Sequence, residues 1–186
     1  MKSSPNQTRT MAVVFALATT ATACAGPYGH SRTYAPTSAE SDAAEGSRDY
    51  DPVMIEREPQ AWTSKSISLF GVVESKVEEG AGTTLATVSL RRLEPRNLCE
   101  SQASDESCRV TVSDTSFGTA RVRLSLRPEE KSGDKSVGPG SLLRVIGKLD
   151  VVADESDKVP IVKATYYRHW PHRFYVTRAK ADLLRQ

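Results

Sequence analysis

The richest group of side chains with binding chemistry lies near the end of the sequence, between Tyr166 and Tyr175. These ten residues contain five of the twelve aromatic residues of the chain, together with two arginines and two histidines. Aromatic rings beside guanidinium groups can stack on sugars or bases and attract anions. The pattern favours rings that close one end of the domain and pack a terminal helix, and alternate residues could also form a surface for an anionic or carbohydrate partner. The contacts predicted for that surface are Tyr167, Arg168, Trp170 and Arg173.

Arginines alternate with apolar residues in the run Ala120-Arg121-Val122-Arg123-Leu124, which makes this run a second candidate surface. Side chains two residues apart on a strand share a face, so Arg121 and Arg123 would both point outward and could contact an anionic ligand. The same alternation describes an ordinary solvated face, and no aromatic residue is interleaved to provide a stacking platform. We therefore do not expect nucleic acid to be the partner.

Residue patterns typical of catalysis and of metal binding are not found in the sequence. It has no G-x-S-x-G turn, no phosphate-binding glycine loop and no H-E-x-x-H pair. His169 and His172 have a spacing that could share a metal on a helix, but Pro171 opposes a helix there and no third ligand is near. The sequence therefore predicts a protein that is not an enzyme and that holds no metal or other cofactor.

Two of the three cysteines, Cys99 and Cys108, enclose eight residues that are nearly all polar. In an oxidising compartment such a pair can close a small loop as a disulfide. Two cysteines without a neighbouring histidine or a second cysteine pair cannot complete a tetrahedral zinc site. We therefore predict a disulfide between Cys99 and Cys108, with free thiols as the alternative.

The start of the chain has the pattern of an export signal. Lys2 and Arg9 precede an apolar run at residues 11–18, and small residues follow up to Cys24. The run is shorter than the roughly 20 apolar residues that span a bilayer, but it fits the apolar region of a secretory signal. The sequence Ala21-Thr22-Ala23-Cys24 resembles the lipobox of bacterial lipoproteins, with Ala21 in the place where leucine is usual. The alternative is a plain secretory signal with an incidental cysteine.

The resemblance to lipoproteins implies cleavage after residue 23 and acylation of Cys24. A diacylglycerol and an N-acyl chain would anchor the protein to a membrane permanently. Ala25 replaces the aspartate that favours inner-membrane retention in the enterobacterial sorting pattern, which implies an outer-membrane location facing the periplasm. Loss of residues 1–23 would leave 23 basic and 23 acidic residues, so the mature chain would have a formal net charge of zero. Its net charge therefore gives no indication of nucleic-acid binding. The mean hydropathy of −0.42 excludes a multi-span membrane protein.

Residues 24–60 have the composition of a disordered tether. The segment is rich in alanine, serine, proline, glycine and acidic residues, and its apolar residues follow no sustained period of a strand or helix. Such a sequence has too little apolar surface to offset the entropy of ordering it. We therefore expect three parts: a signal peptide (1–23), a tether (24–60) and a folded domain (61–186).

From residue 61 onward apolar residues recur at every second position, which is typical of half-buried β-strands. The predicted strands are 66–73, 83–90, 109–113, 120–126, 141–152 and 160–166. Gly71 and Gly147 occupy inward positions of two strands, where a glycine marks a bend or a close backbone approach. Thr177 can cap a short terminal helix over 178–185. The pattern predicts an all-β fold, a small closed barrel of five to six strands, with a β-sandwich as the competing fold.

Three short motifs give residues 65–167 a resemblance to the OB-fold. They are Gly71-Val72-Val73, the run from Asp114 to Val122 and the run from Gly138 to Leu149; they resemble the opening strand, the D-x-x-G hairpin and the glycine turn of that fold. The doubled β-run around the cysteine loop departs from the five-strand pattern and could be an inserted hairpin. OB-folds often bind oligonucleotides or oligosaccharides on the face of their second and third strands, so the resemblance implies a binding face there.

Together these features predict a lipid-anchored cell-envelope module that binds or structurally supports a cell-wall, glycolipid or protein partner. The membrane is a further expected partner, through the N-terminal lipid. If Cys24 is not acylated, the alternative is a soluble periplasmic OB-fold protein that binds a ligand or an oligonucleotide.

Overall fold

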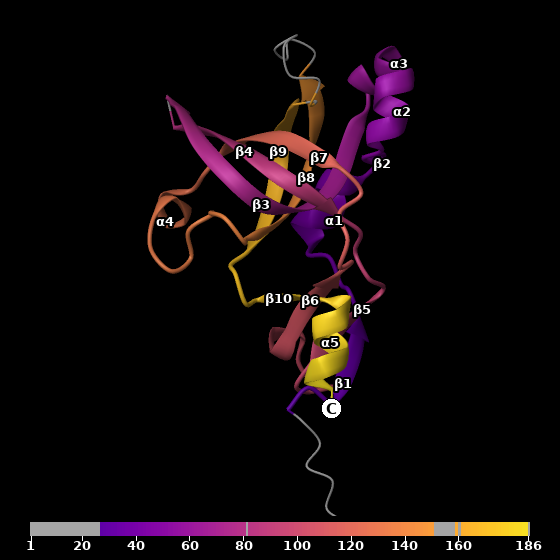
Figure 1. Cartoon of the computed structure of the whole chain (residues 1–186), viewed down its shortest axis with the longest axis vertical. Coiled ribbons are helices and arrows are strands. Elements are labelled where there is room, and N and C mark those ends of the chain that lie inside the picture. Colours follow the sequence, from indigo (N-terminus) through magenta and orange to yellow (C-terminus); the bar gives the residue numbers. More distant parts are fainter. Residues whose placement is uncertain (1–26, 81, 151–158, 160, 186) are drawn as a thin grey trace, which may run out of the picture.

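Five strands close into a barrel, and a smaller second sheet lies below it (Figure 1). The computed structural model describes residues 27–80, 82–150, 159 and 161–185. The larger sheet has the strand order β2-β3-β4-β7-β9-β8, and β8 also pairs with β3, which closes the barrel and leaves β2 as an extra strand beside β3. The bounds of these strands are β2 (Arg48–Asp49), β3 (Ser66–Gly80), β4 (Thr83–Arg91), β7 (Thr119–Ser125), β8 (Leu142–Asp150) and β9 (Ile161–Trp170).

The apolar residues that alternate in the sequence are the ones whose side chains point into the barrel. In β7, Ala120, Val122 and Leu124 are fully buried, whereas Arg121 and Arg123 lie on the outer face. The pairing of β3 with β8 closes the sheet on itself, so the fold is a small closed barrel and not a β-sandwich. Its strand order, with β7 and β9 parallel, is OB-like. The ends of the last two predicted strands, at residues 151–152 and 160, lie outside the described residues.

Gly71 and Gly147 occupy inward positions where neighbouring strands come too close for a side chain. A Cβ on Gly71 would lie 2.8 Å from the Cβ of Val88, and a Cβ on Gly147 would lie 2.8 Å from the carbonyl carbon of Lys163. The register between β8 and β9 also shifts between Ile146 and Gly147. The contacts at Gly147 are with backbone atoms and confirm the predicted close backbone approach. At Gly71 the side chain of Val88 occupies the space, and the nearest backbone atom is the carbonyl oxygen of Ser89 at 3.4 Å.

The doubled β-run around the cysteine loop is an inserted hairpin outside the barrel. Its two strands, β5 (Arg96–Cys99) and β6 (Cys108–Val112), form the middle of a four-stranded sheet with β1 (His30–Thr33) and β10 (Tyr175–Thr177). The terminal helix α5 (Arg178–Leu184) packs on this smaller sheet, where Tyr28, Leu98, Val176 and Ala181 form a core of their own. Segments from both ends of the chain therefore complete the hairpin insertion.

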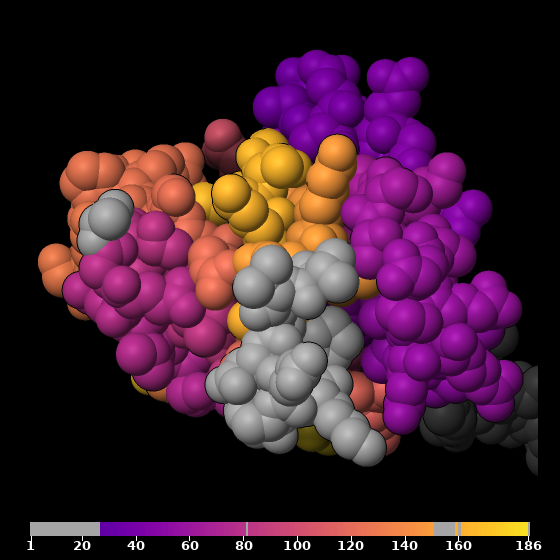
Figure 2. Space-filling view, turned by 90° about the horizontal axis from the view of Figure 1, so that it is seen from above, coloured from indigo at the N-terminus to yellow at the C-terminus, as the bar shows by residue number. Residues whose placement is uncertain are grey.

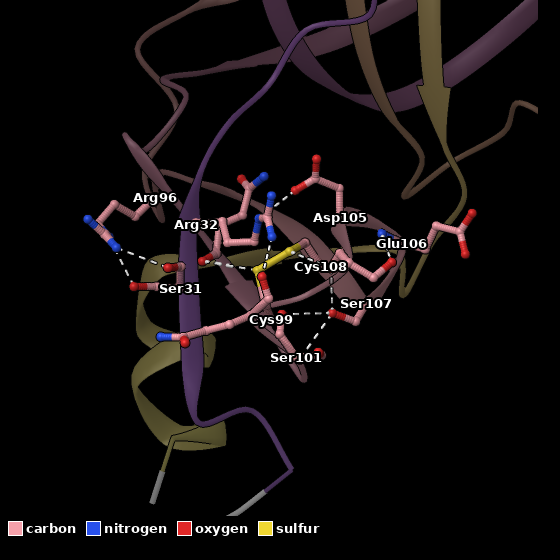
Figure 3. The surroundings of a disulfide bond; sticks show 12 residues. Ser31, Arg32, Arg96, Cys99, Ser101, Asp105, Glu106, Ser107 and Cys108 are labelled. Carbon is pink, nitrogen blue, oxygen red and sulfur yellow. Dashed lines mark hydrogen bonds and ion pairs between the residues drawn. A yellow bond between two sulfur atoms is a disulfide. The ribbon is translucent and has the colours of Figure 1, made fainter.

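The predicted disulfide between Cys99 and Cys108 is confirmed. The two cysteines are register partners on β5 and β6, directly before and after the polar loop (Figure 3). Within the loop, a single turn of 3₁₀-helix, η1 (Asp105–Ser107), is capped by the Ser104 hydroxyl. Arg32 of β1 pairs with Asp105 at 2.7 Å, so the loop is also held to the neighbouring strand.

Removal of this disulfide is expected to lower the free energy of unfolding by about 2–3 kcal/mol, because the unfolded chain regains the freedom of a closed loop of about ten residues. Urea denaturation of the double variant Cys99→Ala/Cys108→Ala, beside the parent protein, measures the difference. Adding a thiol reductant should shift the midpoint of the parent and leave that of the variant unchanged. A parent and variant with the same midpoint would contradict the prediction.

The prediction of a disordered tether over 24–60 is wrong for residues 27–60; residues 24–26 lie outside the described part of the chain. Besides β1 and β2, the segment forms three helices along the side of the barrel. Figure 2 shows the stretch around residues 50–63, which holds the last two of them, in purple at the side of the barrel. The helices are α1 (Ser38–Ala44), α2 (Pro52–Arg57) and α3 (Pro59–Thr63). The folded domain therefore begins before residue 61.

Local caps and a few buried anchors explain why this segment folds despite its polar composition. Thr37 and Glu40 form a capping box at the start of α1, and the carboxylate of Asp51 accepts hydrogen bonds from two backbone N–H groups at the start of α2. Ile55 and Trp62 are buried in the barrel core. An average over the composition does not register such isolated contacts, so it underestimated the order of the segment.

The terminal helix begins at the predicted residue, but a different side chain caps it. Thr177 is in the N-cap position, yet its side chain makes no capping hydrogen bond. The carboxylate of Asp114, from the loop before β7, instead accepts the backbone N–H of Ala179 at 3.0 Å. None of the helices within the described residues is long and apolar enough to cross a membrane.

Candidate functional site

Trp170 is packed between the barrel and the smaller sheet. Only 9% of its surface is exposed, and it lies in one cluster with Leu142 of the barrel and Val110 and Val112 of β6. Its ring stacks on that of Phe70 with a centroid distance of 6.3 Å. The structure therefore gives Trp170 a packing role, although it was also predicted as a binding contact.

Arg168 contributes to a buried ionic cluster around Glu40. Both carboxylate oxygens of Glu40, which is fully buried, accept hydrogen bonds: Oε1 from the Tyr34 hydroxyl and from Nη1 of Arg144, and Oε2 from Nη1 of Arg168 at 3.0 Å. Burial alone would raise the pKa of the Glu40 carboxyl, but these partners together lower it. The cluster therefore fastens α1 to β8 and β9 through an ionised carboxylate.

Tyr167 belongs to a second buried cluster, on the other side of β9, around Glu130 of the short helix α4 (Pro128–Lys131). Its hydroxyl donates to the Glu130 carboxylate and accepts the backbone N–H of Arg127 at 3.2 Å. His169 is also buried here, with its Nδ1 3.8 Å from Glu130, and burial lowers the pKa of the imidazole. These contacts hold α4 against the barrel and occupy the polar groups of Tyr167.

Arg121 and Arg123 brace the barrel wall. Arg123 donates to the Glu79 carboxylate through Nε at 2.7 Å and Nη2 at 3.2 Å, and its Nη1 pairs with Asp150. Arg121 donates from Nη2 to the backbone carbonyl of Val159 at 3.3 Å. The sequence placed both arginines correctly on the outer face, but their charges are engaged with neighbouring strands and do not form an open anion-binding row.

Arg173 is exposed, as the predicted binding contact requires, but it lies apart from the two buried clusters. It lies in the turn between β9 and β10 and adopts a positive φ of 83°. Together with Lys180 and Leu184 of α5, it lines a small pocket of about 180 Å³. The four predicted contacts of the aromatic run are therefore divided among three surroundings, since only Arg168 and Trp170 lie together, with the Arg168 guanidinium 4.7 Å from the Trp170 ring.

A further candidate site is a cleft of about 720 Å³, which the sequence indicates only weakly. It opens where β2 and β4 pair with the same edge of β3: β2 reaches Ser68, β4 begins its pairing at Phe70, and Leu69 lies between them. Its walls are residues 49–53, 68–70 and 91–93, with Phe117 and Arg144. We call this cavity the arginine cleft.

Three guanidinium groups and two aromatic rings determine the chemistry of the arginine cleft. The guanidinium of Arg92 lies over the Phe117 ring at 5.3 Å, and that of Arg144 lies over the Phe70 ring at 5.2 Å. Arg91 donates from Nη1 to the backbone carbonyls of Ser113 and Asp114. Stacking orients the guanidinium planes of Arg92 and Arg144. Arg144 also donates from Nη1 to Glu40, so the edge of Arg92 is the one best able to donate to a planar anion.

Several polar groups at the cleft are buried without a partner. The Nε atoms of Arg91 and Arg144 and the hydroxyl of Tyr50 make no hydrogen bond to any described residue. Burial also raises the pKa of the Tyr50 hydroxyl, so it stays protonated and is a donor. Unsatisfied buried donors are uncommon in folded proteins, and here three of them belong to residues of one cavity.

The side chains of the arginine cleft are of types that can bind an anionic ligand. Its lining holds arginines, aromatic rings and the carboxylates of Asp49 and Asp51, and neither histidine nor cysteine is part of it. Asp51 is engaged in capping α2. Across the described ranges, no three His, Cys, Asp or Glu side chains are grouped so that they could hold a metal ion.

The sequence contained a weak signal for the cleft. Arg91 and Arg92 form an adjacent pair at the end of a predicted strand, where side chains of consecutive residues point to opposite faces. Nothing in the sequence connects them with Arg144 or Phe117, which are brought near by the barrel closure and by the loop before β7. A comparison with protein-family models finds no match, and a comparison with curated proteins finds no relative.

Proposed function

We propose that this protein is a lipid-anchored cell-envelope module that binds a carboxylate-bearing peptide in the arginine cleft. The observation that carries the proposal is the convergence of Arg91, Arg92 and Arg144 on one cavity of about 720 Å³ beside two aromatic rings. Small-ligand sites commonly have volumes of about 300–1,000 Å³ and combine apolar walls with a few polar groups. The peptide belongs to the cell wall or to an envelope protein, and the experiment below separates these two sources.

Charge and shape both favour a carboxylate ligand. A guanidinium presents two parallel N–H groups that match the two oxygens of a carboxylate. The lining has three arginines against two aspartates; Arg144 is also paired with Glu40, so Arg91 and Arg92 supply the charge that a ligand would meet. The rings of Phe70 and Phe117 and the side chain of Leu93 would contact apolar parts of the same ligand.

The alternative function, oligonucleotide binding on the usual OB-fold ligand face formed by β4 and β7, has weaker support than peptide binding in the cleft. On the outer face of β7, Arg123 is neutralised by Glu79 and Asp150. No aromatic residue lies within β4 or β7 to stack a base. The cleft therefore has the stronger case as the binding site.

The anchoring part of the proposal rests on the N-terminal sequence. The short apolar run, the small residues before Cys24 and a disulfide typical of oxidising compartments are consistent with export and acylation. Mass spectrometry of the protein purified from its native membrane should find residue 24 as an acylated N-terminus. The variant Cys24→Ala should leave the membrane fraction, and its retention there would contradict the anchor.

Removal of one exposed arginine from the cleft is expected to weaken peptide binding by about tenfold or more, because a hydrogen bond to a charged group contributes about 1.5–3 kcal/mol. The variant is Arg92→Gln, since Arg92 is exposed and its side chain packs only on the Phe117 ring among the contacts seen here. Calorimetric titration with soluble disaccharide-peptides from digested peptidoglycan, and separately with acidic peptides, measures the affinity. Arg57→Gln, an exposed arginine of α2 outside the cleft lining, is the matched control.

Each ligand series includes the same peptide with its carboxylates amidated. Tight binding of the cell-wall fragments assigns the cell wall as the partner, and binding of acidic peptides alone assigns a protein. In either series, amidation and Arg92→Gln should each weaken binding, while Arg57→Gln should not. If Arg92→Gln does not change the affinity, or if neither series binds, the proposal that the cleft is the ligand site is wrong.

A further inference from the structure

The pocket beside α5 gathers cations and exposed apolar side chains at the end of the smaller sheet. Arg109, Arg173 and Lys180 line it together with His172, and no acidic residue does. Phe174, Leu183 and Leu184 are 62%, 68% and 37% exposed, which makes them three of the five large apolar residues that the described part of the chain leaves in contact with solvent. Leu184 itself lines the pocket, and Phe174 and Leu183 are the chain neighbours of the lining residues Arg173 and Leu184.

The geometry of α5 puts its own members of this group, Lys180, Leu183 and Leu184, on a common face. Lys180, Leu183 and Leu184 are spaced i, i+3 and i+4, which places them side by side on a helix, whereas Asp182 does not share their face. Ala181 is buried on the inner side against Tyr28 and Val176. A helix face with lysine beside leucines, flanked by arginines, has the composition of a surface that lies in the headgroup region of a membrane.

The start of the described chain lies at this same face. Tyr28 packs against Ala181 of α5, and the Arg109 guanidinium lies over the Tyr28 ring at 4.8 Å. Glu100, the acidic residue beside Tyr28, interacts with its hydroxyl. Cys24 precedes Pro27 by three residues, so their Cα atoms are at most about 11 Å apart whatever path the chain takes.

Taking the lipid anchor at Cys24 proposed above as its basis, we propose that the face formed by Arg109, Arg173, Phe174, Lys180, Leu183 and Leu184 docks on an anionic phospholipid surface. Headgroup phosphates would occupy the pocket between the three cations, and the three apolar side chains would enter the interface. Because the anchor can lie no more than about 11 Å from the folded part, this face is held at the bilayer. The barrel then points away from the membrane, since Figure 1 shows it at the opposite end of the molecule from α5.

The test uses a chain that begins at residue 24 and carries Cys24→Ser, so it has no acyl chain and keeps every described residue. It should bind phosphatidylcholine vesicles that contain phosphatidylglycerol and not vesicles of phosphatidylcholine alone. The variant Arg173→Gln/Lys180→Gln should lower the partition coefficient about 30-fold at low salt, as expected from the contribution of each basic residue near an anionic surface. The control Lys148→Gln/Lys163→Gln removes the same charge from exposed positions on the barrel and should change it less than about twofold.

Equal losses in the two double variants, with unchanged melting temperatures, would show a nonspecific effect of net charge and overturn the proposal. Absence of any preference for anionic vesicles would do the same. As a second measurement, an environment-sensitive dye on Leu183→Cys should shift its emission to the blue on anionic vesicles, and the same dye on Lys163→Cys should not. Since this chain carries no lipid, a negative result leaves the anchor and the cleft standing, whereas an unmodified Cys24 in the native protein rejects the anchor alone.

Discussion

Replacing Glu40 with glutamine is expected to lower the free energy of unfolding by about 3 kcal/mol. The substitution keeps the size of the side chain but removes the charge that faces Arg144 and Arg168. Removing one partner of a buried ion pair costs about 3–5 kcal/mol, and the lower end applies because the Arg168 side chain is 33% exposed and can recover water. Urea denaturation followed by tryptophan fluorescence measures the loss, since Trp170 lies directly under the Arg168 guanidinium at 4.7 Å.

Asp42→Asn is the matched control, because Asp42 is an exposed acidic residue of the same helix α1. It should change the stability by less than about 0.5 kcal/mol. If both variants unfold at the same urea concentration as the parent, the Glu40 cluster does not hold the N-terminal segment. Limited proteolysis should also cut the Glu40→Gln variant near α1 before the barrel is degraded.

The same carboxylate predicts a pH dependence with a defined sign. The pKa of Glu40 in the folded protein lies below its ordinary value of 4.5, because the partners on both oxygens outweigh burial. A depressed pKa contributes stability that is fully present above the unfolded value and is lost as the pH falls through the folded pKa. Below pH 4.5, therefore, the difference in stability between the parent and Glu40→Gln should shrink.

Replacing Gly147 with alanine should destabilise the barrel by about 3 kcal/mol or more. The added Cβ would overlap the backbone carbonyl oxygen of Lys163 and lie 3.0 Å from the Cα of Ala164. Backbone on an adjacent strand cannot move aside as a flexible side chain could, so the strain exceeds that of an ordinary overpacked core. Thermal and urea unfolding of the variant report the loss.

Gly138→Ala controls for the loss of a glycine as such. A Cβ on Gly138 would meet no atom within 4 Å, and its φ is not positive. This substitution should be neutral or raise the stability by up to about 1 kcal/mol, because alanine restricts the unfolded chain. If Gly147→Ala is as stable as Gly138→Ala, the backbones of β8 and β9 lie farther apart at this position than the structure indicates.

Sequence reasoning succeeded where a local period fixes the geometry. The alternation of Ala120, Val122 and Leu124 identified an inward face because side chains in a strand repeat every two residues, whatever surrounds them. The same reasoning marked Gly71 and Gly147 as close approaches, and a short polar loop between two cysteines indicated a disulfide. Each of these signals is contained in fewer than a dozen consecutive residues.

The segment over 27–60 shows where composition misleads. It was predicted to be a tether because its apolar residues are few and aperiodic, yet Glu40 is fully buried in it. Its partners Arg144 and Arg168 are more than one hundred residues away in the sequence. A carboxylate that looks solvated in the sequence becomes a structural anchor only when two strands present their arginines to it.

The arginine cleft required the tertiary structure for the same reason. Asp49, Arg91 and Arg144 come from three separate strands that meet because β2, β4 and β8 all pair with β3. The sequence by itself determined the strand faces, the disulfide, the terminal helix and the export-signal pattern, because each depends on neighbours along the chain. Only the closed barrel decided which arginines are braced, which are buried and which line a cavity, since these outcomes depend on long-range pairing that no local spacing encodes.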